Sequence, residues 1–476
     1  MRRGIFFHDC VVERVMYRLS LKETPGRSQV ALTPSGGLTR SGRFGGALSR
    51  ALLGAALLLA AVGVQAQLRL PSLPSLPSLP SVPPPVLRSV DSTLAPADLS
   101  GLRRRSIDQL LSRHARELER DPAGEPVLRG ELLAVPSSAA ARDALSAAGF
   151  TIVREQVLEG LDQRWLVLKP AAGQDLGAAL AQARRSDPGG RYDYHHVYTG
   201  SGDVAAPTRA SAVGVAAPGG ALRVGLIDGG IDRRHPVLRD AALQSFGCDG
   251  QPHPSTHGTA VASLLVGRGD GFRGAAAGAT LYAADVYCDA PSGGSVEAIA
   301  QAFAWLAREK VPVINVSLVG PPNQVLERVV AAVVARGHLV VAAVGNDGPA
   351  APPLYPAAWP GVVAVTATDA RRRVLPEAGR GPHVAFAAPG SDVAGAASGS
   401  ARFVPLRGTS FAAPLVAAEL ATRLSAPDTT QAARAVAALA QAAIDLGAPG
   451  RDPIYGFGLV GEALRNDPER LPLAQR

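Results

Sequence analysis

A serine in a glycine- and alanine-rich stretch is the first residue that could do chemistry. Ser410 lies in "RGTSFAAPLVAAEL" (407–420), directly after Gly-Thr and before a run of helical composition. A serine at this point could cap a helix, because the first turn of a helix has N–H groups that lack a partner. It could instead be a nucleophile, since those N–H groups and the helix dipole favour incoming negative charge. This stretch alone is consistent with both interpretations.

A nucleophilic serine needs a base, and the chain offers a candidate base and a candidate carboxylate. His257 begins the helical segment "HGTAVASLLVG", and Asp228 ends the apolar run "LRVGLID" just before two glycines. In such a set the imidazole takes the proton of the serine, and the carboxylate fixes the tautomer of the imidazole. Taken singly, Asp228 fits a turn or a metal loop, and His257 fits a helix start. Taken together, the three residue types favour nucleophilic catalysis.

A metal site is the competing use of the histidines. His253 and His257 are four residues apart, a spacing that could place two imidazoles on one ion. Pro252 and Pro254 would interrupt a helix there, so the pair does not predict a metal site. No loop of alternating Asp and Asn typical of calcium binding is visible. We therefore expect no cofactor and leave a calcium requirement open.

The elements that must position these residues follow a repeating pattern after residue 221. Buried parallel strands are typically continuous apolar runs, and the sequence has five such runs, at 222–228, 280–287, 311–318, 338–345 and 361–368. Helical segments are expected near 257–266, 295–309 and 323–336. The alternation predicts an α/β fold with a doubly wound, mostly parallel sheet. Ligands bind at the carboxyl ends of such strands, which is where Asp228 and Asn346 fall.

A smaller α+β domain is expected over residues 130–198. The pattern predicts strands at 131–135, 151–156, 164–170 and 191–198, with helices at 137–148 and 176–185. This strand–helix–strand–strand–helix–strand order is the split βαβ arrangement of ferredoxin-like domains. A joint rich in Gly, Ala and Ser, 199–220, separates it from the larger domain.

The N-terminal region explains the charge of the chain. Residues 1–66 carry nine Arg or Lys and three Asp or Glu, so they supply +6 of the net charge of +8. With little positive charge elsewhere, a nucleic-acid partner has no support. Basic residues precede the apolar run 51–64, which small residues follow, as in a secretory signal. We expect export, to the outside or to the periplasm. Retention of 51–64 as a membrane anchor is the alternative.

Two further segments lie between the leader and the small domain. The Leu-Pro-Ser repeat at 70–86 is expected to be an extended polyproline II spacer, and 98–120 a solvated, Arg-rich amphipathic helix.

The chain has three cysteines. Cys10 belongs to the leader, which leaves Cys248 and Cys288. These two could form one disulfide or remain two buried thiols.

The segments with Asp228, His257 and Ser410 also carry a family resemblance. "GTSFAAP", "HGTAVAS" and the strand that ends in Asp-Gly-Gly-Ile-Asp resemble the three catalytic boxes of the subtilisin-like serine proteases. "DPIYGFGLV" (452–460) is similar to the closing segment of that family, and the resemblance covers roughly 215–465. It implies a serine endopeptidase in which Ser410 attacks the peptide carbonyl, His257 transfers the proton and Asp228 orients His257.

The resemblance also implies an oxyanion donor and a substrate-binding strand. Asn346 matches the family's carboxamide donor, and Pro414 is expected in the first turn of the helix that Ser410 begins. The substrate-binding residues are expected to be Ser317, Leu318, Val319 and Gly320. Val319 stands where the family usually has glycine, so its branched side chain should narrow or block the pocket for the residue before the cut bond.

Members of the family are commonly synthesised with a ferredoxin-like propeptide, so the resemblance implies that the small domain is a propeptide. We expect domains at 1–66 (leader), 67–129 (spacer and helix), 130–200 (propeptide) and 201–476 (peptidase), with residues near 198–201 in the cleft until self-cleavage. A permanent accessory domain is the alternative. The expected partners are polypeptide substrates and the chain's own propeptide, and the expected state is a monomer.

Two other classes of function compete with a serine endopeptidase. A nucleotide-binding module would need spaced glycines or a P-loop lysine, and "VGLIDGGID" has neither. A protease-like scaffold that acts as a surface or binding protein, with restricted or lost activity, stays open because of Val319.

Overall fold

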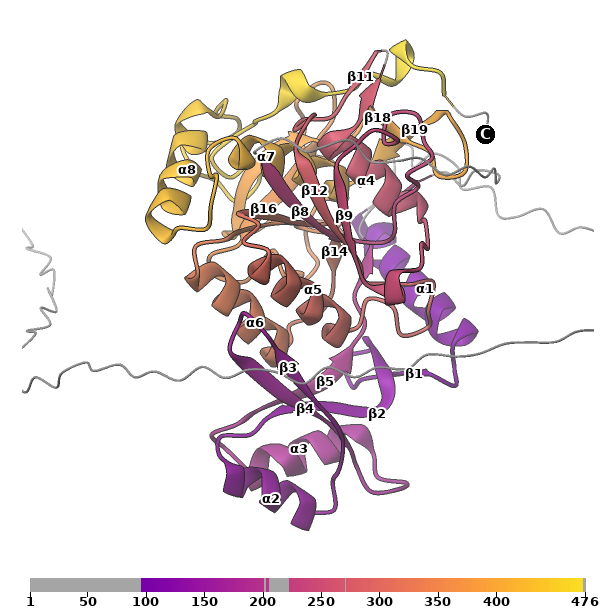
Figure 1. The fold of residues 1–476 in the computed structure, drawn as a ribbon, viewed down its shortest axis with the longest axis vertical. Coiled ribbons are helices and arrows are strands. Elements are labelled where there is room, and N and C mark those ends of the chain that lie inside the picture. Colours follow the sequence, from indigo (N-terminus) through magenta and orange to yellow (C-terminus); the bar gives the residue numbers. More distant parts are fainter. Residues whose placement is uncertain (1–95, 201–202, 205–221, 270, 474–476) are drawn as a thin grey trace, which may run out of the picture. The chain divides into compact units, whose positions relative to one another are not determined.

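Seven parallel strands form the sheet at the centre of the larger domain (Figure 1). The computed structural model describes residues 96–200, 203–204, 222–269 and 271–473, all within the second of two contact units, 83–476. The expected leader, the Leu-Pro-Ser spacer and most of the joint 199–220 lie outside the described residues. The strand order is β17 (Val384–Pro389), β16 (Val363–Thr368), β15 (Leu339–Ala343), β13 (Val313–Val316), β8 (Arg223–Asp228), β12 (Thr280–Asp285), β9 (Leu243–Phe246).

The side chains of each strand alternate between two hydrophobic cores, one on each face of the sheet. In β15, Val341 packs into the core that contains helices α4 (Thr256–Val266), α7 (Thr409–Ala421) and α8 (Thr429–Ala442). Its neighbours Val340 and Ala342 pack into the core that contains α5 (Val296–Arg308) and α6 (Gln324–Ala335). Because both faces are covered, the strands are apolar throughout. The predicted α/β class is confirmed.

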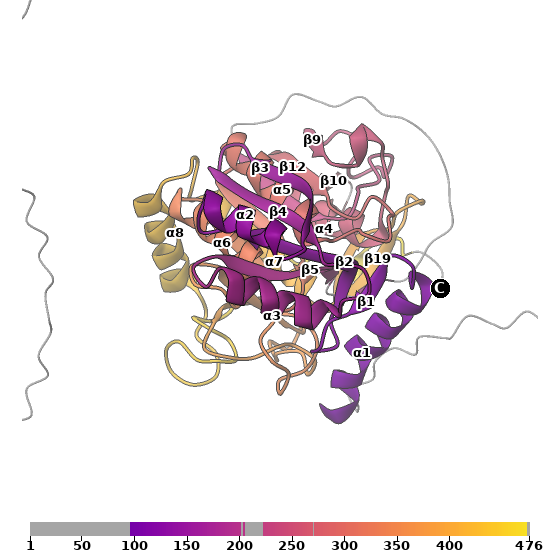
Figure 2. The ribbon, with the colours of Figure 1, turned by 90° about the horizontal axis from the view of Figure 1, so that it is seen from below.

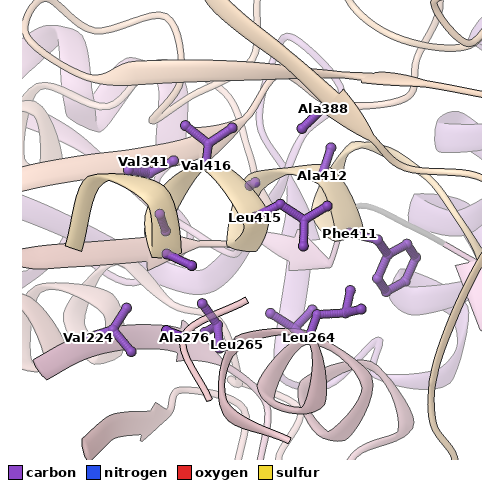
Figure 3. Close-up of a cluster of buried hydrophobic side chains, with 14 of the residues drawn as sticks. Val224, Leu264, Leu265, Ala276, Val341, Ala388, Phe411, Ala412, Leu415 and Val416 are labelled. Carbon is purple, nitrogen blue, oxygen red and sulfur yellow. The ribbon is translucent and has the colours of Figure 1, made fainter. Parts of the chain in front are cut away.

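Helix α7 is apolar on all sides, because it lies between the sheet and α4. Phe411, Ala412, Leu415 and Val416 all have no exposed surface, and Figure 3 shows them packed between strand residues and the α4 side chain of Leu264. A helix that is hydrophobic all round is a buried helix. Its first turn is therefore held firmly at the edge of the sheet.

The small domain has a four-stranded antiparallel sheet in the order β5-β2-β4-β3, with β1 (Leu118–Arg120) added at the start of β2. Helices α2 (Ala139–Ala147) and α3 (Leu176–Ser186) pack on one face of it (Figure 2). This is the split βαβ topology that the sequence predicts. The strands are β2 (Pro126–Val135), β3 (Thr151–Leu158), β4 (Gln163–Lys169) and β5 (Arg191–His196). Since β2 begins at Pro126, the first strand starts before the expected boundary at residue 130.

The other face of the small sheet packs against helices α5 and α6 of the larger domain. Leu133, Trp165 and Val167 belong to the same hydrophobic core as the buried residues of those two helices. At the rim, Arg154 pairs with Glu297 of α5 at 2.6 Å and with Glu131 of the small domain at 3.1 Å. The two domains therefore share a continuous apolar core edged by ion pairs.

Helix α1 (Pro96–Arg113) precedes the small domain and lies beside its sheet, next to β1 (Figure 2). The expectation of a solvated helix over 98–120 is wrong at its end, because α1 stops at Arg113 and residues 118–120 form β1. It is also wrong for one side of the helix. Ile107 is buried, and the side chain of Arg103 is only 11% exposed. The reason is that one side of the helix packs against the protein while the other arginines face solvent.

Cys248 and Cys288 form a disulfide, so the alternative of two free thiols is wrong. Cys248 follows β9 and Cys288 follows β12, the two strands at one edge of the sheet. The bridge ties the loops that leave these strands at their carboxyl ends. Within the described ranges, no helix has the length and apolar character needed to cross a membrane.

The first prediction concerns this bridge. Its cysteines are 40 residues apart, and closing such a loop restricts the unfolded chain. We expect the double variant Cys248→Ser, Cys288→Ser to lose about 3–4 kcal/mol of unfolding free energy, measured by urea unfolding. Wild-type protein unfolded in a reductant should match the variant. Equal stability of the variant and the oxidised wild type would contradict the prediction.

The second prediction concerns pH and the rim of the domain interface. Burial favours the protonated form of Glu131, but hydrogen bonds from His195 and Arg154 lower the pKa of Glu131 to about 2. A lowered folded-state pKa stabilises the fold above the ordinary value of 4.5, and the contribution is lost as the pH falls toward 2. Glu131→Gln should therefore cost about 1–3 kcal/mol at pH 6 and almost nothing near pH 2 in urea unfolding. A cost that stays constant over this range would refute the argument.

Candidate active site

The candidate residues meet at the carboxyl ends of the parallel strands. Asp228 is the last residue of β8, and Asn346 follows β15. His257 and Ser410 each occupy the second position of a helix, α4 and α7 respectively. In a parallel sheet with helical connections, strand carboxyl ends and helix amino ends share one edge, so residues distant in sequence come together there.

Asp228 and His257 are in direct contact. The Asp228 side chain is 2% exposed, and its Oδ1 lies 2.9 Å from Nδ1 of His257. Oδ1 also accepts a hydrogen bond from the N–H of Gly229 at 2.6 Å. An ionised carboxylate can only accept, so Nδ1 of His257 carries the proton and Nε2 presents its lone pair. The pair thus holds the imidazole in the tautomer that a general base requires.

The contact depends on how closely the start of α4 approaches the end of β8. The Oγ of Ser255 accepts the N–H of Gly258 at 2.9 Å, and the N–H of Ser255 is bonded to the carbonyl of Gly230. A Cβ on residue 258 would lie 2.1 Å from the carbonyl oxygen of Gly229. Only glycine fits at 258, and this close approach sets the position of His257.

Ser410 is bound to the neighbouring strand end by a reciprocal pair of hydrogen bonds. Its Oγ donates to the carbonyl of Ser317 at 3.2 Å, and the Oγ of Ser317 donates to the carbonyl of Ser410 at 3.0 Å. Pro414 lies inside α7 rather than in its first turn, so the expectation for Pro414 is wrong. Because Pro414 has no N–H, the carbonyl of Ser410 lacks its helical partner, and Ser317 supplies one.

The contact of the Phe411 ring with His257 shows that the starts of α7 and α4 are neighbours. The centroid of that ring lies 5.4 Å from the centroid of the His257 imidazole. Since Phe411 directly follows Ser410 and is fully buried, the first turn of α7 faces the first turn of α4. The structure therefore brings Asp228, His257 and Ser410 into one locality.

Asn346 lies against the amino end of α7. Its Oδ1 accepts the N–H of Thr409 at 3.1 Å, and the Oγ1 of Thr409 accepts the N–H of Gly345 at 3.2 Å. With the oxygen of the amide directed to the helix, the NH₂ group is the end that can donate to a ligand. The helix start and this amide can together stabilise a negative charge next to Ser410.

Two of the four residues expected to bind substrate, Leu318 and Val319, already pair with another segment of the chain. β14 (Leu318–Val319) pairs antiparallel with β6 (Thr199–Gly200), the segment that leaves the small domain. A Cβ on Gly200 would lie 3.8 Å from the ring of His257. Val319 is 3% exposed and pairs with Thr199, so its side chain does not prevent strand pairing at this edge.

The segment after this strand is also paired. β7 (Asp203–Val204) is antiparallel to β19 (Phe403–Arg407), the strand that leads into α7. Residues 201–202 lie outside the described residues. The chain is thus paired on both sides of them, first with β14 and then with β19.

One charged contact near Asn346 was not anticipated. Nε of Arg103 lies 3.4 Å from Oδ2 of Asp347, and its Nη2 lies 2.5 Å from Oε2 of Glu125. Burial raises the pKa of Asp347 to about 6, although Arg103 opposes the shift. The sequence carried no signal for this contact, because an arginine on an exposed-looking helix is ordinary.

Among the described residues, the cluster of His, Cys, Asp and Glu side chains with metal-ligand spacing is Cys248, Asp285 and Cys288. The disulfide uses both sulfur atoms of this cluster. It therefore does not offer thiolate ligands in this state.

Comparisons with known proteins agree with this arrangement. A sequence profile of the Subtilase family matches residues 219–458, half of the chain. Subtilisin Savinase of Lederbergia lenta is 37% identical over 205 residues, which cover 42% of this chain and 74% of that protein. The minor extracellular protease Epr of Bacillus subtilis (strain 168) is 32% identical over 213 residues, which cover 43% of this chain but only 32% of Epr.

A solved structure extends the similarity of fold beyond the larger domain. Fervidolysin from Fervidobacterium pennivorans, a keratinolytic enzyme related to subtilisin, superposes with a TM-score of 0.59 at 19% identity. The superposition covers 73% of this chain and 62% of fervidolysin. At that identity it shows a shared fold alone. With the profile match and the similarity to Savinase, the chain belongs to the subtilase family of serine endopeptidases.

Proposed function

We propose that this protein hydrolyses peptide bonds through a triad of Asp228, His257 and Ser410. The Oγ of Ser410 attacks the carbonyl carbon of the bond while Nε2 of His257 takes its proton. His257 then gives that proton to the leaving amine, which leaves an acyl-enzyme on Ser410. Water then attacks the acyl carbon while Nε2 of His257 takes its proton. The bond to the Oγ of Ser410 breaks, His257 returns the proton to that oxygen, and the acid is released. The hydrogen bond of 2.9 Å between Asp228 and His257 is the observation that carries this proposal.

Asn346 and the N–H of Ser410 are the proposed donors to the oxyanion. The tetrahedral intermediate places a negative charge on the former carbonyl oxygen, next to the amino end of α7. The orientation of the Asn346 amide supports this role, since its oxygen is held by Thr409. Fixed donors of this kind stabilise the transition state without reorganising as the charge develops.

The substrate is proposed to bind as an extended strand along Ser317, Leu318, Val319 and Gly320. The antiparallel pairing of β6 with β14 supports this mode, because it shows a chain segment lying in that register beside His257. Main-chain hydrogen bonds of this type contribute affinity for many sequences, and specificity for side chains comes from the neighbouring pockets.

We further propose that the protein is made as a zymogen and cuts itself between Gly200 and Asp203. The pairing of Thr199–Gly200 with β14 and of Asp203–Val204 with β19 supports this position. Before the cut, the segment that leaves the small domain pairs with β14 and excludes other substrates from that strand edge. Export remains the expected destination, with polypeptide substrates, no nucleic-acid partner and a monomeric state.

The third prediction tests the nucleophile. A fluorophosphonate should label the wild-type protein covalently, and Ser410→Ala should abolish both the label and self-cleavage, because the Oγ of Ser410 is the proposed acceptor of the acyl group. Labelling is read by mass spectrometry and cleavage by the N-terminal sequence of the larger fragment. Ser398→Ala is the matched control and should behave as wild type. Labelling of both Ser410→Ala and wild type, or of neither, would favour the non-catalytic scaffold.

The fourth prediction tests the oxyanion donor. Asn346→Ala should lower kcat on a peptide substrate by about 10²–10³-fold with little change in KM, since the donor acts on charge formed only in the transition state. This range is carried over from the corresponding donor of subtilisin, which is the known example. Circular dichroism should show an unchanged fold. A change confined to KM would contradict the assigned role.

A further inference from the structure

Asn346 lies on a turn that has a glycine at each end. Gly345 and Gly348 have φ angles of 94° and 95°, in the left-handed region that glycine adopts readily. Hydrogen bonds of 3.1 and 3.2 Å join the turn to Thr409. A carboxamide that donates to a developing charge must be held in place before the charge forms. Because the backbone between the two glycines does not hold it by itself, the turn needs support from neighbouring segments.

The loop 375–379, between β16 and β17, gives this support. The N–H of Gly348 donates to the carbonyl of Glu377 at 2.8 Å. The N–H of Gly379 donates to the carbonyl of Gly345 at 3.0 Å. Two main-chain hydrogen bonds therefore hold the turn, one at each of its glycines.

The loop is itself anchored in the larger domain. Leu375 and Ala378 are buried in the core that contains α7. The N–H of Leu375 donates to the carbonyl of Ala367 in β16 at 2.9 Å. A Cβ on residue 379 would lie 2.9 Å from the carbonyl oxygen of Val344, so the loop and the end of β15 are in close main-chain contact. The loop thus holds the turn from a fixed position.

The side chain of Glu377 connects this loop to the strand that leads into α7. Its Oε1 lies 2.7 Å from Nε of Arg407, and its Oε2 accepts a hydrogen bond from Nη2 of Arg407 at 2.9 Å. The Glu377 side chain is only 10% exposed, so solvent screens this ion pair little. A planar guanidinium that meets a carboxylate at two points fixes direction as well as distance.

These contacts form a closed circuit. It runs from the side chain of Glu377 to Arg407, the last residue of β19, and along the main chain to Thr409. The N–H of Thr409 connects it to Asn346, and the N–H of Gly348 returns it to the carbonyl of Glu377. The start of the helix that bears the candidate nucleophile and the turn that bears the candidate oxyanion donor are therefore tied to one residue.

We propose that Glu377 is a positioning residue, and that its ion pair with Arg407 holds the carboxamide of Asn346 at a fixed place beside the nucleophile. Glu377 makes no contact with the reacting atoms in this role, and acts through Asn346. The inference rests on the proposed peptidase function and adds to it the residue that sets the geometry of the oxyanion site. A pair that stabilised only the fold would change the amount of folded enzyme and leave its turnover unaltered.

The expected effect follows from the loss of this pair. Glu377→Gln keeps the size of the side chain and removes the charge that holds the guanidinium, so the turn gains freedom. A displaced donor stabilises the oxyanion less, and kcat on a peptide substrate should fall about 5–50-fold, with KM changed less than about twofold. Arg407→Lys keeps the charge but loses the two-point contact, and should give a smaller loss of kcat.

The experiment is a cycle of four enzymes: wild type, Glu377→Gln, Asn346→Ala and the double variant. All are brought to the processed form of the wild type, the slow ones with a trace of tagged wild type that is then removed. If Glu377 acts through the Asn346 amide, Glu377→Gln should lower kcat less than about twofold once that amide is absent. Equal losses in both backgrounds, or no loss in either, would overturn the proposal.

Glu462→Gln is the matched control. Glu462 forms a similar two-point pair with Arg372, at 2.8 and 2.7 Å, but both side chains are partly exposed. Such a surface pair contributes little, so kcat should stay within about twofold of wild type. Urea unfolding of every variant measures its stability separately from its turnover.

Fluorophosphonate labelling of the wild type distinguishes the two levels of the argument. An unlabelled wild type refutes the proposed function and the positioning role with it. A labelled wild type whose cycle shows no coupling between Glu377 and Asn346 refutes the positioning role alone. If Glu377→Gln fails to fold, Arg407→Lys takes its place in the same cycle.

Discussion

The close approach of helix α4 to the end of strand β8 is the constraint on which the site depends. The main chain at Gly258 touches the carbonyl of Gly229 so closely that no side chain fits between them. Ser255 secures the same turn by capping the helix and bonding to Gly230. His257 belongs to this turn. The main-chain packing of the turn against β8 therefore fixes the position of its imidazole relative to Asp228.

The second helix of the site is fixed by burial and by one exchange of hydrogen bonds. Helix α7 has apolar neighbours on every side, so it cannot slide without opening cavities in the core. Pro414 removes one helical hydrogen bond, and Ser317 takes its place at the carbonyl of Ser410. The strand edge expected to bind substrate and the candidate nucleophile are thereby parts of one hydrogen-bonded unit. The segment that leaves the small domain adds a strand, β6, to that edge.

The sequence predicted most elements because their signals are local. Apolar runs marked β8, β12, β13, β15 and β16, and the order of elements in the small domain gave its topology correctly. Several elements were missed, among them β9 and β17. The short edge strand β9 is exposed in its centre and has no apolar run, and β17 ends in proline within an alanine-rich stretch. The start of β2 at Pro126 was missed since the residues before 130 give no alternating pattern.

The sequence by itself determined the residue types, their order and the segments that bear them, because glycine-flanked Asp, His and Ser at element ends are visible along the chain. From the family resemblance we also expected residues near 198–201 beside the site, and the structure pairs Thr199–Gly200 with β14 there. Only the tertiary structure decided the contacts between segments that are distant in sequence. These are the pairing of Cys248 with Cys288, the contact of Arg103 with Asp347, and the burial of Tyr198 against Pro321. These depend on the distance between segments that are far apart in sequence, and no local pattern encodes that distance.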